Sequence, residues 1–187
     1  SRGLGDVYKR QRVARSWEKA GALPSGKTLV VAAPGNLPPP SKRGDVFRQA
    51  AVKALDTLSR NPNGFFLMIE GSNIDKAAHS NNLEEMMEEL LDFDRTAGAV
   101  LDWASKHPGT LVVITADHNT GAFALTGGSR EQGEITGRFG SGSHDGVAVP
   151  VYAFGAGSGD FTGIYENTDI FNKIMNALKK GADKPVR

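Results

Sequence analysis

Six side chains of the types that bind divalent cations fall in three short clusters of this 187-residue sequence. They are Glu70, Asp75, His79, Asp117, His118 and His144. Carboxylates and imidazoles together suit zinc, and oxygen ligands suit magnesium. The pattern therefore predicts a hydrolytic site that holds more than one metal ion.

The first cluster runs from Glu70 to His79 and follows an apolar run at residues 65–69, which predicts a buried strand. Asp75 and His79 are four positions apart. On a helical turn this spacing puts a carboxylate and an imidazole on one face, where both can bind a single ion. The cluster therefore predicts a strand followed by a helical turn that presents two ligands.

The second cluster, Asp117 and His118, follows a similar apolar run at residues 111–114. His144 lies in the glycine-rich stretch 140–146. In open α/β sheets, ligands bind beyond the carboxyl ends of the strands. We therefore expect the clusters to converge at one rim of a sheet.

Each residue alone has a simpler explanation. Glu70 could cap a helix or pair with a cation, and Asp75 could lie at a helix start, where the helix dipole favours a carboxylate. Asp117 lies in a turn-forming stretch. The combination is what favours a site, because three of the four histidines lie beside carboxylates or in a glycine-rich loop. The fourth, His107, ends a predicted helix before Pro108 and needs no function there.

The elements that must position these side chains alternate between strands and helices. Apolar spacing predicts helices over residues 12–20, 45–60, 82–106 and 167–180, and strands over 28–33, 65–69, 111–114 and 149–155. This alternation is typical of an α/β protein, with a mainly parallel sheet covered on both faces by helices.

The longest predicted helix carries a clear start signal. Asn82 precedes the apolar stripe and Glu85 follows three positions later, which is the capping pattern. Four glutamates at positions 84, 85, 88 and 89 are expected to form the water-facing side of this helix. They could in principle bind metal, but adjacent exposed glutamates usually do not.

The bulk composition is that of an ordinary soluble domain, with 39% hydrophobic and 23% charged residues. No apolar run approaches the roughly 20 residues that a membrane span requires. The sequence has no cysteine, so any metal must be held by histidines and carboxylates.

Charge is distributed unevenly along the chain. Residues 1–60 hold 12 Lys and Arg against 4 Asp and Glu, whereas residues 61–187 hold 10 against 17. A basic leading segment could bind nucleic acid. Its charges are scattered, however, with only Tyr8 and Trp17 as aromatic neighbours, so we favour a solvated surface and expect no nucleic acid.

One motif points to a different class of protein. Residues 21–28, GALPSGKT, match the P-loop pattern G-x-x-x-x-G-K-[ST]. A working P-loop leaves a strand and opens a helix whose amides bind phosphate. Here the motif runs into the apolar residues 29–31, the reverse order, so a P-loop NTPase is kept only as a minor alternative.

The clusters together resemble a known family. Residues 70–79 (EGSNIDKAAH), 115–121 (TADHNTG) and 143–144 before 149–155 (VPVYAFG) are similar to the C-terminal half of alkaline phosphatases, over residues 28–180. The resemblance implies a three-layer α/β/α sandwich. It implies a first zinc ion on Asp75, His79 and His144, a second on Asp117 and His118, and a magnesium ion on Glu70. Lys76 would reach phosphate through water.

The resemblance also implies an activity, the hydrolysis of phosphate monoesters through a phosphoserine, in the periplasm or otherwise outside the cytoplasm. Two zinc ions about 4 Å apart can hold the attacking and leaving oxygens of such a transfer. The family's nucleophilic serine and phosphate-binding arginine would lie upstream, and no Asp-Ser pair occurs in residues 1–187. We therefore expect a truncated enzyme, inactive alone, whose full-length form could be a homodimer.

The expected domain organisation has two parts. Residues 1–11 resemble translated sequencing-adapter sequence and are interpreted as a non-native leader, and residues 12–187 as the C-terminal part of one domain. Two rivals remain open. One is a phosphodiesterase or phosphomutase of the same superfamily, and the other is a metal-binding protein without catalysis.

Overall fold

The computed structural model describes residues 12–20 and 26–182, which belong to two units divided between residues 46 and 47. In the first unit, β1 (Arg12–Ala14) pairs in parallel with β2 (Thr28–Val30). Helices α2 (Trp17–Ala20) and α3 (Pro40–Arg43) complete its regular structure. The helix predicted over residues 12–20 is thus wrong for its first three positions, where the backbone bonds to β2 instead. The predicted leader, residues 1–11, lies outside the described residues.

The described end of the P-loop-like motif does not open a helix. Thr28 is the first residue of β2, so the motif runs into a strand as the sequence order indicated. Residues 21–25 lie outside the described part of the chain. The geometry that phosphate binding by a P-loop requires is therefore not met at Lys27 and Thr28.

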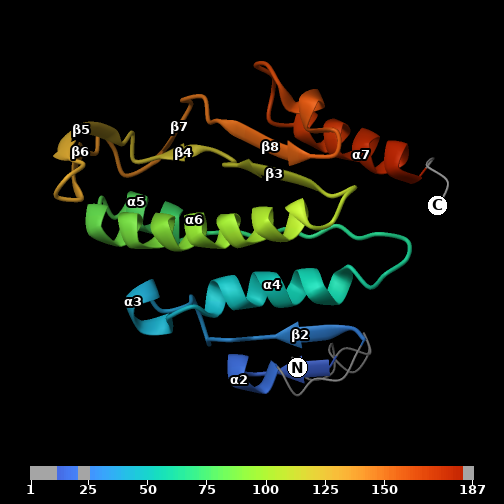
Figure 1. The fold of residues 1–187 in the computed structure, drawn as a ribbon. Helices are drawn as coiled ribbons and strands as arrows, with labels where there is room; N and C mark the ends of the chain where they lie inside the picture. Colours follow the sequence, from blue (N-terminus) through green and yellow to red (C-terminus); the bar gives the residue numbers. More distant parts are fainter. Residues whose placement is uncertain (1–11, 21–25, 183–187) are drawn as a thin grey trace. The chain divides into compact units, whose positions relative to one another are not determined.

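The second unit contains the candidate ligands, and Figure 1 labels its α-helices and strands. Its elements in chain order are α4 (Val46–Leu58), α5 (Asn73–His79), α6 (Leu83–Ser105), β3 (Leu111–Thr115), β4 (Asn119–Thr120), β5 (Ala124–Ser129), β6 (Glu134–Arg138), β7 (His144–Asp145), β8 (Val151–Gly155), η1 (Ser158–Phe161) and α7 (Asp169–Ala182). The predicted long helices and the strands after residue 110 are confirmed as α4, α6, α7, β3 and β8.

The strands of this unit pair in antiparallel fashion: β3 with β8, β4 with β7, and β5 with β6. The prediction of a mainly parallel sheet is therefore wrong for the described strands of this second unit. The reason lies in the connection between β3 and β8. Thr115, which ends β3, pairs with Val151, which begins β8, so the chain re-enters the sheet at the same end of the strands where it left. A parallel strand would have to start at the opposite end, which requires a crossover connection.

The strand predicted at residues 65–69 is also not formed, because no neighbouring strand in the described residues pairs with it. Its side chains nevertheless alternate in exposure as those of a strand do. Phe66 is 64% exposed and Met68 73%, while Phe65, Leu67 and Ile69 are half-buried.

Helix α6 begins as predicted, since the Asn82 side chain accepts a hydrogen bond from the Glu85 amide at 3.1 Å. Its expected water-facing side is partly wrong. Glu89 is only 4% exposed and accepts a hydrogen bond from the Asn73 amide group at 3.2 Å. Leu90 and Leu91, two apolar residues of the same helix, are by contrast 43% and 50% exposed. The buried face of α6 therefore includes Glu89, whose carboxylate is hydrogen-bonded, in place of Leu90 and Leu91.

A small apolar core joins α5 to α6. Ala77 and Ala78 of α5 pack with Met86 of α6, and Phe123 and Phe139 lie against this cluster. Because small alanines occupy one face of α5, the helix lies close to α6 and its opposite face remains available. Figure 1 shows α5 beside the N-terminal part of α6.

The middle and the C-terminal part of α6 are held by aromatic and polar contacts. Phe47 of α4 stacks on Phe93 at 6.4 Å between ring centroids, and the Trp103 indole donates to Asp56 of α4 at 3.2 Å. The contacts of α6 with β3 and β8 fix the strand pair on the same helix. Among the helices of residues 12–20 and 26–182, none is both long and apolar enough to cross a membrane.

Candidate metal centre

Helix α5 presents Asp75 and His79 on one face. The two residues are one helical turn apart, and the His79 Nε2 atom lies 3.4 Å from Asp75 Oδ2. Their neighbours Ala77 and Ala78 are buried on the face that packs on α6. The apolar packing of α5 therefore determines where the carboxylate and the imidazole stand.

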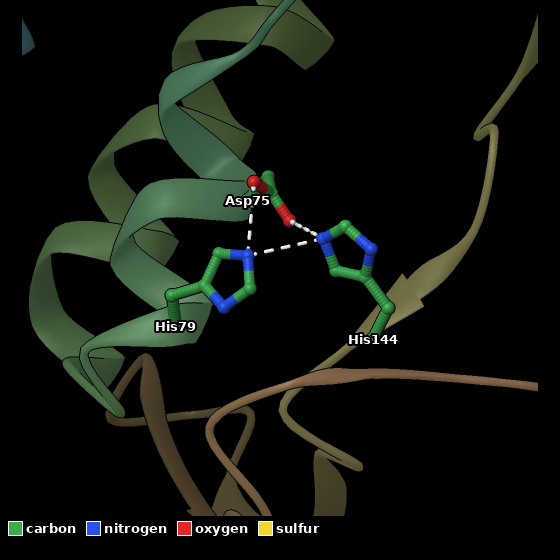
Figure 2. A group of neighbouring side chains, drawn as sticks. All are labelled: Asp75, His79 and His144. Carbon is green, nitrogen blue, oxygen red and sulfur yellow. Dashed lines mark hydrogen bonds and ion pairs between the residues drawn. The ribbon is translucent and has the colours of Figure 1, made fainter.

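His144 reaches the same place through the short pairing of β4 and β7. In this pair Thr120 lies opposite His144, and Asn119 opposite Asp145. The His144 Nε2 atom is 3.5 Å from Asp75 Oδ1 and 3.0 Å from His79 Nε2. Figure 2 shows the three side chains pointing toward one another from α5 and β7.

The resulting group fits a metal ion of zinc size. One ligand atom from each of Asp75, His79 and His144 lies within 4.8 Å of the others. Donor atoms about 2.0–2.1 Å from a tetrahedral ion are separated by about 3.3–3.4 Å. The Nε2 atoms of His79 and His144 lie 3.0 Å apart, close to this separation. His79 Nε2 lies 3.4 Å from Asp75 Oδ2, and His144 Nε2 lies 3.5 Å from the other oxygen, Oδ1. One carboxylate and two imidazoles also leave a fourth position for another ligand.

The hydrogen bond behind His79 fixes its tautomer. The Nδ1 atom lies 2.7 Å from the Gly142 carbonyl oxygen, which can only accept, so Nδ1 carries the proton. In the neutral ring the Nε2 lone pair then points toward His144 and Asp75. Two imidazole nitrogens 3.0 Å apart repel each other unless a proton or a cation lies between them. A backbone carbonyl behind a histidine is a common arrangement at metal sites.

The same reasoning applies to His118. The Thr120 hydroxyl donates to Asp75 Oδ1 at 2.7 Å, so its oxygen accepts from His118 Nδ1 at 3.2 Å. The free lone pair of His118 is then on Nε2, which lies 3.1 Å from Asp117 Oδ2. Two acceptors at this distance suit a shared cation or a protonated imidazole. Thr120, which is 8% exposed, thus links the two sets of ligands.

The two sets are adjacent in space. The His118 ring stacks on the His144 ring with centroids 3.6 Å apart. The side chain of Asp117 is 83% exposed and that of His118 28%. Asp117 and His118 therefore form a pair beside the group of three, and the Asp117 carboxylate of this pair is exposed to solvent.

Glu70 and Lys76 are not part of the group formed by Asp75, His79 and His144. Glu70 is exposed and lies outside the group of three. The Lys76 ammonium donates to the Asn73 side chain at 3.4 Å on the surface of α5.

Asp145 and Asn119 are polar residues of the centre that spacing alone did not reveal. Asp145 accepts hydrogen bonds from the Asn119 side chain and from the amides of Ala122 and Val147. The hydrogen bond from the Val147 amide, together with that from Asn119, holds the pKa of Asp145 below its usual value. The only sequence signal was that each residue directly follows a candidate histidine.

A family profile described as alkaline phosphatase matches residues 36–137, more than half of the chain. The chain belongs to the alkaline phosphatase family. The resemblance drawn from the ligand clusters is thereby confirmed at the level of the family.

Individual alkaline phosphatases show how much of the enzyme these residues represent. The chain is 29% identical to alkaline phosphatase 4 of Bacillus subtilis (strain 168), over 72% of this chain and 44% of that protein. It is 31% identical to streptomycin-6-phosphate phosphatase of Streptomyces griseus, over 92% of this chain and 43% of that protein. The chain thus spans less than half the length of these relatives.

A solved structure gives the same proportion. The alkaline phosphatase of the Antarctic bacterium TAB5 superposes with a TM-score of 0.77 at 33% identity, over 92% of this chain and 53% of that one. A variant of that enzyme, with a TM-score of 0.75, 33% identity and coverage of 90% and 52%, was solved with magnesium bound at its M3 site. The fold is therefore alkaline-phosphatase-like over part of the enzyme.

The predicted convergence of the ligand clusters is confirmed for Asp75, His79, His144 and His118. Their roles as ligands, and that of Glu70, stay predictions. The expected common rim exists, but it is formed by the end of β3 and the start of an antiparallel β8.

Proposed function

We propose that this chain carries most of the metal-binding side of an alkaline phosphatase centre that hydrolyses phosphate monoesters. Asp75, His79 and His144 would hold one zinc ion, and Asp117 and His118 would contribute to a second. The observation that carries the proposal is the group of three, whose donor atoms stand within 4.8 Å with the His79 tautomer fixed by Gly142.

When bound, paired divalent ions of this kind neutralise phosphoryl charge and hold the oxygens of an in-line transfer. The chain's own residues provide the frame for this chemistry. Asp75 supplies negative charge to the first site, and Thr120 donates to it while orienting His118. The half-exposed side chains of His79 and His144 leave the centre accessible to a phosphate ester.

Magnesium is assigned to Glu70 by family resemblance and by the preference of this ion for oxygen ligands and retained waters. A lone exposed glutamate is an incomplete site, as is the pair Asp117 and His118. We infer that the remaining ligands and the nucleophilic serine belong to parts of the enzyme outside these 187 residues. The absence of an Asp-Ser pair within them supports this inference.

The three-layer sandwich is likewise proposed for the whole enzyme. Residues 65–69 alternate in exposure and leave Phe66 and Met68 in solvent, as expected for a sheet strand whose neighbours are elsewhere. A location outside the cytoplasm and a homodimeric full-length form are proposed on family resemblance alone. Fractionation of cells that express the complete gene would test the location.

Among the rivals, a phosphodiesterase or phosphomutase would share the ligands and differ in the substrate pocket. The similarity to a phosphatase of streptomycin 6-phosphate favours a phosphomonoester. A metal-binding protein without catalysis would bind zinc equally well, and only turnover by the complete protein separates it from an enzyme.

Zinc titration of the metal-free chain, followed by calorimetry, tests the proposed centre. We expect two unequal sites, the tighter one formed by the three ligands. His144→Ala should weaken the tighter site by at least about tenfold, since it removes a direct ligand. His107→Gln is the matched control, because His107 instead stacks on Trp103 with centroids 3.7 Å apart. If only the weaker site responds to His144→Ala, the assignment is wrong.

A further inference from the structure

Asp145 is a carboxylate whose two oxygens both accept hydrogen bonds. The Asn119 side chain donates to both oxygens at 3.1 and 3.0 Å. The Ala122 amide donates to Oδ2 at 3.0 Å and the Val147 amide to Oδ1 at 3.1 Å. Since these N–H groups occupy its oxygens, Asp145 is an unsuitable ligand for an ion.

The partners of Asp145 lie on both ligand-bearing loops. Asn119 directly follows His118, and Asp145 directly follows His144. The backbone ladder between these loops is only two residues long on each side, and the Gly121 amide adds one hydrogen bond to the Ser143 carbonyl at 2.9 Å. So short a ladder is weak on its own. The carboxylate of Asp145 therefore reinforces the connection between the two histidine loops with side-chain hydrogen bonds.

The backbone beyond Asn119 also needs an anchor. Ala122 has a φ of 45°, in the left-handed region that residues with a Cβ rarely adopt. Its amide is one of the groups that Asp145 holds. Without this acceptor, the turn that follows β4 would be free to relax toward ordinary backbone angles.

We propose that Asp145 is a positioning residue of the metal centre, which holds the loop of His118 against the loop of His144 before any ion binds. The stacking of the two imidazoles at 3.6 Å is the arrangement that it preserves. This inference rests on the proposed function, because it assigns Asp145 a role toward the zinc ligands.

Three variants change the hydrogen bonds of Asp145 to different extents. Asp145→Asn keeps the shape but replaces one acceptor oxygen by a donor, which would face N–H groups. Asp145→Glu keeps the negative charge but moves the carboxylate. It therefore separates positioning from simple attraction of a cation. Asn119→Ala removes only the side-chain part of the connection and serves as a milder variant if Asp145→Asn folds poorly.

The test measures the zinc dissociation constant by competition with a chelator, and the histidine ring resonances of the metal-free chain by NMR. We expect Asp145→Asn and Asp145→Glu to weaken zinc binding by about 10- to 100-fold, as loss of an outer hydrogen bond to ligands does. We expect Asn119→Ala to weaken it less. The ring resonances of His118 and His144 should shift in all three variants, because their stacking changes.

Asp160→Asn is the matched control, since Asp160 is also a partly exposed aspartate but pairs with Lys180 at 2.8 Å. It should leave both readouts unchanged. Unchanged zinc affinity and unchanged histidine resonances in Asp145→Asn would overturn the inference, as would full affinity in Asp145→Glu. If the wild-type chain binds no zinc, the proposed metal centre itself is wrong. If the wild type binds zinc and the Asp145 variants bind it equally well, only the role of Asp145 is wrong.

Discussion

The ligands of the candidate centre are held in two different ways. On the helix side, Asp75 and His79 belong to one turn of α5, which a small apolar core fixes to α6. On the loop side, Asp117, His118 and His144 come from loops that polar contacts bring together. Helical spacing is local, whereas the loop side depends on contacts between distant parts of the sequence. The helix side should therefore persist when the loop side is disturbed.

The largest expected effect concerns catalysis. With zinc and magnesium present, the 187-residue chain should hydrolyse an aryl phosphate at alkaline pH no faster than its His144→Ala variant, because we propose that the nucleophilic serine lies outside these residues. Turnover is measured by release of the phenolate. Hydrolysis that His144→Ala abolishes would show that these residues already contain a complete active site.

A core substitution should damage the helix side. Met86 is 7% exposed and packs on Ala77 and Ala78, so Met86→Ala should lower the free energy of unfolding by about 2 to 5 kcal/mol. Met68→Ala is the matched control at a side chain that is 73% exposed, and should change it by less than about 0.5 kcal/mol. Urea denaturation measures both. Equal losses would mean that the α5–α6 core is not what holds the helix side.

A glycine substitution should disturb the loop side. Gly121 has a φ of +82°, and a Cβ there would lie 2.8 Å from the Phe139 ring. Gly121→Ala should therefore lower the free energy of unfolding by about 1 to 3 kcal/mol. Gly98→Ala, in open space within α6, should instead raise it by about 0.5 to 1 kcal/mol. A neutral Gly121→Ala would contradict the packing described for this loop.

The smallest effect is expected away from both sides. The hydrogen bond and charge of Lys180 hold the pKa of Asp160 below its usual value of 3.8. The contribution of this pair to stability is thus present above that value and is lost as the pH falls through the lower pKa of the folded state. Asp160→Asn should lose slightly less stability than the wild type on acidification below about pH 4. A steeper loss in the variant would contradict the sign.

The sequence predicted the features that depend on local contacts and not those that depend on distant ones. The face shared by Asp75 and His79 and the Asn82 cap of α6 depend on neighbours within a turn, and both were predicted. The direction of β8 and the burial of Glu89 depend on distant segments, and both were predicted wrongly. Asp145 carries no pattern of its own. Its importance is visible only once its three donors are placed around it.

Location of the ion in crystals of the zinc-loaded chain is the decisive test of the proposed metal centre, because anomalous diffraction at the zinc edge marks the metal alone. We expect a peak about 2.0–2.2 Å from the Asp75 carboxylate and from Nε2 of both His79 and His144. A second, weaker peak is expected beside Asp117 and His118. Zinc bound elsewhere, with no peak among Asp75, His79 and His144, would contradict the proposed metal centre.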